Sequence, residues 1–137
     1  MNYLNPIMTE PLRDISNQGL AHIGDAVFEL MVRTWLCTTG TSTAKNLHNR
    51  AVSFVSAKAQ AVAAEKILTL LSEEENIIYK RGRNIHVNAV PKGSTHEEYH
   101  AATGMEALFG YLYLTGKQER LNELFIHIIK PDSLPSK

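Results

Sequence analysis

Two short stretches decide how this chain folds: residues 23–27, with the sequence IGDAV, and residues 105–110, MEALFG. Each places one carboxylate inside an apolar helical pattern. On a helical wheel the neighbours of Asp25 are Ala21, Phe28, Val32 and Leu36, so its carboxylate is predicted to point into an apolar sector. The same projection surrounds Glu106 with Tyr99, Ala102, Thr103, Phe109, Gly110 and Tyr113. A buried, unpaired carboxylate is costly, so the two sites predict a shared divalent cation with its waters.

Each carboxylate also has a purely structural interpretation. Asp25 would suit the N-cap of a helix that begins at Ala26, although position 28 is Phe rather than the Glu or Gln of a capping box. Glu106 lies in the middle of a predicted helix, where a buried ion pair with an arginine would satisfy it. The residue pattern alone leaves both alternatives open.

The 137 residues are expected to form a single domain, 1–137, with one hydrophobic core. The chain is 44% apolar and 20% charged, which is ordinary for a globular protein. No apolar run is long enough to span a membrane, and the first residues lack the pattern of a secretory signal. The single cysteine, Cys37, excludes an internal disulfide and fits a reducing compartment, so a cytoplasmic location is expected.

The charges are balanced overall but unevenly distributed. Fourteen basic and fourteen acidic side chains cancel, yet residues 30–64 and 76–96 contain no acid. These two windows hold eight of the fourteen basic residues: Arg33, Lys45, Arg50, Lys58, Lys80, Arg81, Arg83 and Lys92. A neutral protein with a polyanion-binding face would show this pattern, and so would an ordinary solvated surface.

The periodicity predicts helices almost throughout and no strand of useful length. We expect a short helix over 9–17, then helices over 20–37, 44–71 with a break near Ser53, 72–84, 96–114 and 118–129. Ser42 or Thr43, Ser72 and Thr95 are the expected caps. Residues 85–94 are expected to form a loop and 130–137 a loose tail.

Glycines within a predicted helix indicate where helices cross. Gly104 and Gly110 each cost about 1 kcal/mol relative to alanine in a helix. Such residues are commonly kept where another backbone approaches closely, so the helix that carries Asp25 is expected to cross beside Glu106.

Several separate motifs, in order, resemble the ribonuclease III endonuclease domain over about residues 18–129. Residues 20–27, LAHIGDAV, resemble its signature helix, and residues 106–110, EALFG, its second catalytic helix. Further motifs are similar to the Mini-ribonuclease III branch, which consists of the nuclease domain alone: LH at 47–48, FVSAKAQ at 54–60, KRGRN at 80–84, VPK at 90–92 and GYLYL at 110–114.

The resemblance implies an all-α, homodimeric, Mg²⁺-dependent endoribonuclease, with Mn²⁺ as a possible substitute, that cuts both strands of duplex RNA. Asp25 and Glu106 would be the catalytic and metal-binding residues. RNA contacts are expected from His48, Arg81, Arg83, Asn84 and Lys92. The branch further implies maturation of the ends of large-subunit (23S-type) ribosomal RNA precursors, with a ribosomal protein or the assembling subunit as a further partner. Phe28, Trp35 and Tyr111 are candidates for the dimer interface or the core.

The chain also departs from the family pattern. Longer ribonucleases III usually carry acids at the positions of Gln18, Ala21 and Thr103, so only Asp25 and Glu106 remain here. This loss supports an alternative, a non-catalytic RNA-binding or ribosome-assembly module on the same fold. A zinc-protease pattern at residues 96–100, HEEYH, has no clear third ligand and is interpreted as coincidental.

Overall fold

A computed structural model describes residues 1–40, 43–87 and 89–130, so the expected tail from 131 onward lies outside the described residues. The elements are α1 (Asn17–Thr38), α2 (Ala44–Val55), α3 (Ala57–Ile67), the 3₁₀ turn η1 (Leu68–Leu70), α4 (Glu73–Arg83), α5 (His96–Leu114) and α6 (Gln118–Ile129). The described part of the chain contains no strand, which confirms the all-α prediction. No described helix is long and apolar enough to cross a membrane.

Local hydrogen bonds explain where the helices begin. Ser72 and Thr95 cap α4 and α5 as predicted, and each forms a reciprocal capping box with Glu75 or Glu98. Thr43 caps α2 by accepting from the backbone N–H of Asn46 at 3.2 Å. The alternative cap, Ser42, lies outside the described residues. These caps act within three residues of their partners, which is why the sequence alone located them.

Two expected elements are different in the structure. The break predicted near Ser53 occurs at Ser56, whose extended backbone ends α2 and whose hydroxyl caps α3. The helix predicted over 9–17 is wrong, because that segment forms turns and bends. It is held by tertiary contacts instead: the Met8 N–H donates to the Leu114 carbonyl at 2.8 Å, and the Glu10 carboxylate accepts from the Lys117 ammonium at 2.8 Å.

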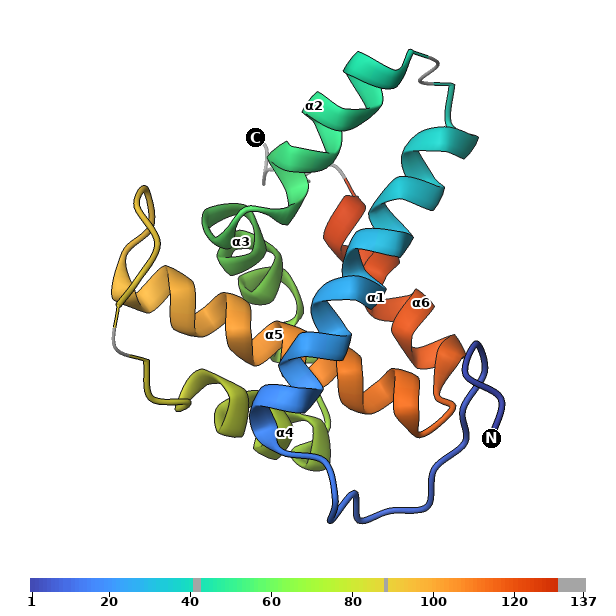
Figure 1. Cartoon of the computed structure of the whole chain (residues 1–137), viewed down its shortest axis with the longest axis vertical. Helices are drawn as coiled ribbons and strands as arrows, with labels where there is room; N and C mark the ends of the chain where they lie inside the picture. Colours follow the sequence, from blue (N-terminus) through green and yellow to red (C-terminus); the bar gives the residue numbers. More distant parts are fainter. Residues whose placement is uncertain (41–42, 88, 131–137) are drawn as a thin grey trace.

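The backbones of α1 and α5 touch where they cross (Figure 1). A Cβ added at Gly24 would lie 1.6 Å from the carbonyl oxygen of Glu106, and one at Gly110 would lie 2.0 Å from that of Leu20. This confirms the crossing predicted beside Glu106. Gly104 serves a different contact, since a Cβ there would lie 2.8 Å from the Tyr79 ring of α4.

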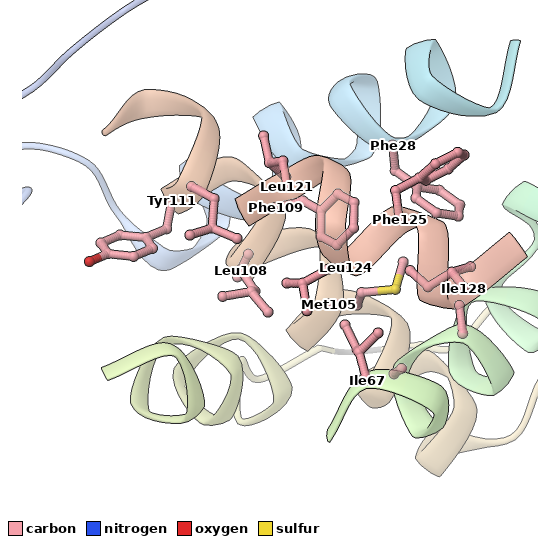
Figure 2. Close-up of a cluster of buried hydrophobic side chains, with 14 of the residues drawn as sticks. Phe28, Ile67, Met105, Leu108, Phe109, Tyr111, Leu121, Leu124, Phe125 and Ile128 are labelled. Carbon is pink, nitrogen blue, oxygen red and sulfur yellow. The ribbon is translucent and has the colours of Figure 1, made fainter. Parts of the chain in front are cut away.

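The hydrophobic core forms around α5, which is buried along most of its length from Ala102 to Leu114. Figure 2 shows its side chains meeting Phe28 of α1, Ile67 of α3 and the apolar face of α6. Phe28 and Tyr111 are only 1% and 4% exposed, so these two interface candidates are core residues. Trp35 is partly buried, and its ring packs edge-on against Phe54 with centroids 5.0 Å apart.

Candidate active site

Asp25 and Glu106 come together at the crossing of α1 and α5, close enough that the Asp25 charge and a hydrogen bond with Asp25 both act on Glu106. Asp25 lies in the middle of α1, whose N-cap is Ser16, so the capping interpretation of Asp25 is wrong. The predicted burial of Asp25 is also wrong, because its side chain is exposed. The reason is that Gly24 makes the close contact with α5, which leaves Asp25 at the rim of the crossing.

Glu106 is partly buried and has an unusual acidity. Burial raises the pKa of its carboxyl to about 8, with further raising contributions from the charge of Asp25 and the hydrogen bond with Asp25. A hydrogen bond with Gln60 acts in the opposite direction. No basic side chain is among the groups that shift this pKa. The buried ion pair that the sequence left open for Glu106 is instead made by Glu75 with Arg120.

Gln60 is a site residue that the sequence analysis did not identify. It lies in the first turn of α3 and is only 1% exposed, although it is polar. The one available signal was its position on the stripe formed by Ala63, Ala64 and Ile67, where an apolar side chain would be expected.

The side chains at the crossing suit a hard divalent cation such as Mg²⁺ or Mn²⁺. All the available ligand atoms are oxygens: the two carboxylates and, beside Glu106, the buried Oε1 of Gln60, which has no hydrogen-bond partner in the described part of the chain. The described residues contain no group of three or more His, Cys, Asp and Glu side chains arranged for a metal. Water or substrate oxygens would therefore have to complete the coordination.

The three positions where longer ribonucleases III were expected to carry acids provide no further carboxylate for a cation. Ala21 is buried against the core, and Gln18 is exposed at the start of α1. The Thr103 hydroxyl already donates to the Tyr99 carbonyl at 2.9 Å. Asp25 and Glu106 thus suit one hydrated cation better than two.

A separate hollow of about 910 Å³ lies between α3, the end of α4 and the start of α5. Arg83 and Asn84 line it together with the basic residue Lys58, the histidines His86, His96 and His100, and the glutamates Glu65, Glu97 and Glu98. The rings of His96 and His100, from the zinc-protease pattern, are stacked with their centroids 6.4 Å apart. Lys58 and Arg83, one basic residue from each acid-free window, therefore line the same hollow.

The other predicted RNA-binding residues are dispersed. Arg81 faces the opposite side of α4, in a hollow it shares with Glu10, Glu74 and Tyr111. His48 lines a smaller hollow on α2 with Arg33 and Cys37. Lys92 is exposed in the connection between α4 and α5, at the left of Figure 1, whereas α2 lies at the top of that view. The structure therefore groups Arg83 with Asn84 and separates them from Arg81 and His48.

Comparison with known proteins gives consistent matches over most of the chain. The model of the ribonuclease III domain matches residues 18–117. The chain is 45% identical to Mini-ribonuclease 3 of Thermoanaerobacter sp. (strain X514), covering 88% of this chain and 87% of that protein. It is 41% identical to Mini-ribonuclease 3 of Enterococcus faecalis, covering 86% and 91%.

A solved structure agrees with these matches. The crystal structure of a protein from Fusobacterium nucleatum superposes with a TM-score of 0.81 at 34% identity, covering 89% of this chain and 94% of that one. The similarity thus extends to the arrangement of the helices. The chain belongs to the ribonuclease III family, is similar to its Mini-ribonuclease 3 members over most of its length, and is an endoribonuclease.

Proposed function

We propose that this chain is a Mg²⁺-dependent endonuclease of duplex RNA in which Asp25 and Glu106 hold the cation. The observation that carries the proposal is the carboxyl pair itself. Burial and the neighbouring Asp25 raise the pKa of Glu106 to about 8, and no basic side chain of the described residues is among the groups that act on it. A non-catalytic module would gain stability by replacing both acids, so their retention favours the enzyme.

Each residue at the crossing has a defined part in this proposal. Glu106 would hold the cation as a carboxylate together with Asp25, whose exposed side chain faces the solvent side from which a phosphodiester would approach. When bound, the cation would activate water and stabilise the charge that develops on the phosphate. Addition of water across the bond between phosphorus and the 3′ oxygen leaves a 5′-phosphate and a 3′-hydroxyl.

Recognition of the RNA would depend on duplex geometry rather than on sequence. A-form RNA presents phosphates and 2′-hydroxyls across a wide minor groove. The hollow lined by Lys58, Arg83 and Asn84 offers basic and amide donors for such groups, and Lys92 is exposed in the adjacent connection. The natural substrate in this proposal is the ends of large-subunit ribosomal RNA precursors in the cytoplasm, free or on assembling particles.

Cutting both strands requires two sites, which a symmetric dimer would supply. A groove of about 670 Å³ on α1 is lined mainly by apolar side chains, among them Ile23, Val27 and Leu30, and Asp25 lies at the same groove. Leu30 is 63% exposed in the single chain. Burying this groove against a second copy would cover exposed apolar surface and bring the two active sites close together.

The cleavage assay that tests the proposal compares two substrates. One is a duplex RNA labelled on both strands, and the other is each of those strands alone, without its complement. With Mg²⁺ or Mn²⁺ we expect cuts in both strands of the duplex, and with EDTA none. Cleavage that persists in EDTA, or an absence of cleavage on every duplex tested with metal present, would overturn it.

Sedimentation equilibrium tests the dimer. We expect about twice the chain mass of 15.3 kDa for the unmodified protein and a monomer for Leu30→Glu. Ile126→Glu is the matched control, because Ile126 is 44% exposed on α6 and does not line the groove. A strict monomer that makes paired cuts would contradict the two-site geometry.

A further inference from the structure

The amide of Gln60 is a polar group at a buried position of α3, where the other buried side chains are apolar. Gln60 is 1% exposed and ranks among the largest fully buried side chains of the protein. The remaining buried residues of α3 are Ala63, Ala64 and Ile67, all apolar. A buried amide that is not fully hydrogen-bonded destabilises a protein by roughly 1–3 kcal/mol, so a leucine or methionine would pack here at lower cost.

The two ends of the amide have different surroundings. Its Nε2 donates to the carbonyl oxygen of Val55 at 3.2 Å. The same amide lies close enough to Glu106 to act on that carboxyl as a hydrogen-bonding group that lowers its pKa. Its Oε1 is buried without a partner in the described part of the chain. Val55 is the last residue of α2, whose carbonyl has no partner within that helix. The contact with Val55 therefore holds the amide at the junction of α2 and α3.

These contacts separate two interpretations. If Gln60 only closed the end of α2, nothing in that role would require its amide to lie beside the Glu106 carboxyl. The position beside Glu106 gives the amide a second use, because a buried side chain held from α2 can fix the orientation of the carboxylate next to it. Side chains in this supporting position orient the ligands of many metal sites.

We propose that Gln60 is a positioning residue of the divalent-cation site, where its amide holds the Glu106 carboxylate in the orientation that faces Asp25. This inference rests on the proposed function, because it assumes that Asp25 and Glu106 bind the cation. It gives the reduced pair of acids a third, uncharged member, contributed by α3.

The decisive variant is Gln60→Met, which keeps the length of the side chain and removes the donor. Mn²⁺ binding to the protein alone, without RNA, is measured by calorimetry, together with the metal-free melting temperature and single-turnover cleavage. We expect the Mn²⁺ affinity to fall by about 10-fold or more and the cleavage rate at saturating RNA to fall with it. The affinity for RNA in Ca²⁺ should stay unchanged, and the melting temperature should be equal or higher.

Gln118→Met is the matched control, since Gln118 is an exposed glutamine of α6 whose amide donates to Asn5. It should leave Mn²⁺ affinity and cleavage unchanged. A Gln60→Met protein whose Mn²⁺ affinity lies within twofold of the unmodified protein would overturn the inference. Failure of both Gln60→Met and Gln60→Leu to fold would overturn it too, because the amide would then be kept for stability.

Glu106→Gln distinguishes this inference from the proposed function. If Glu106→Gln keeps normal Mn²⁺ binding and cleavage, the proposed function fails and the inference fails with it. If Glu106→Gln loses both while Gln60→Met keeps both, only the role of Gln60 is wrong.

Discussion

Two glutamates of this protein are enclosed by the fold but have opposite electrostatic surroundings. Glu75, in the first turn of α4, is 7% exposed and accepts two hydrogen bonds of 2.8 Å from the guanidinium of Arg120. These bonds hold the pKa of Glu75 below its ordinary value despite its burial. Glu106, in α5, has Asp25 as its charged neighbour, and its pKa is raised to about 8.

The difference separates a carboxylate that the fold itself neutralises from one for which we propose a bound cation as the partner. Arg120 also donates to the Leu70 carbonyl at 2.6 Å and to Glu123 at 2.8 Å, so the charge on Glu75 is neutralised within a network. In the described part of the chain no cation is among the groups that act on the Glu106 carboxyl, and its neighbours Asp25 and Gln60 add no positive charge. An external cation is the partner that would satisfy it.

The largest expected effect is on catalysis. Asp25→Asn or Glu106→Gln should lower the cleavage rate by about a thousandfold, equivalent to about 4 kcal/mol of transition-state stabilisation. Both proteins should keep their helical content and their RNA binding, and Glu106→Gln should melt at a higher temperature without metal, because a buried acid is removed. Near-normal cleavage by both variants, measured in single turnovers, would refute the assignment.

The next effect concerns stability at Glu75. Glu75→Gln should lower the free energy of unfolding by about 3 kcal/mol, because it leaves the Arg120 guanidinium without its enclosed partner. Glu123→Gln, which changes an ion pair of the same arginine at a carboxylate that is 59% exposed, should cost under about 1 kcal/mol. Denaturant melts measure both, and cleavage at saturating RNA below the melting range should be normal. Equal costs for the two variants would contradict the comparison.

A smaller effect should appear in the pH dependence of the metal-free protein. The folded pKa of Glu106, about 8, lies above its ordinary value of 4.5, so the folded state retains a proton that the unfolded state loses. The resulting stabilisation is complete below about pH 4.5 and disappears as the pH rises through 8. From pH 6 to pH 8 the free energy of unfolding should fall by about 2 kcal/mol more than in Glu106→Gln.

Mn²⁺ should remove most of that extra fall, because a bound cation stabilises the ionised carboxylate in the folded state. Denaturant melts of the unmodified protein and of Glu106→Gln, in parallel with and without Mn²⁺, give the difference directly. Identical pH profiles for the two metal-free proteins would show that the pKa of Glu106 is not raised.

The smallest effect is on RNA binding and concerns arginine side chains outside the carboxyl pair. If Arg83 contacts phosphate, Arg83→Ala should weaken duplex RNA binding for all sequences alike and reduce the salt dependence by about one unit of slope. Arg81→Ala is the comparison, because Arg81 lines a different hollow, on the other side of α4 from Lys58 and Asn84, and its change in slope shows whether that side also contacts phosphate. Cleavage at saturating RNA should be little affected by either substitution, since neither arginine is among the groups that act on Glu106. An unchanged slope with a lower melting temperature for Arg83→Ala would indicate a helix-end role instead.

Much of the architecture was predictable from short-range chemistry. Thr95 and Glu98 cap α5 by contacts three residues apart, and the helix runs from His96 to Leu114 as the sequence indicated. The glycine at position 110 correctly located the crossing with α1. The motifs around Asp25 and Glu106 were sufficient to place the chain in the ribonuclease III family, which the comparisons confirmed.

Tertiary structure decided the rest, because a helical wheel gives directions around one axis but not where a second helix crosses it. Only the packed fold shows that Gly24, rather than Asp25, takes the contact with α5 and that Gln60 of α3 meets Glu106. The same limit applies to Arg81 and Arg83, which are two residues apart in the sequence but line different hollows. Caps and periodicity depend on neighbours along the chain, whereas the charge environment of a carboxylate depends on groups that only folding brings together.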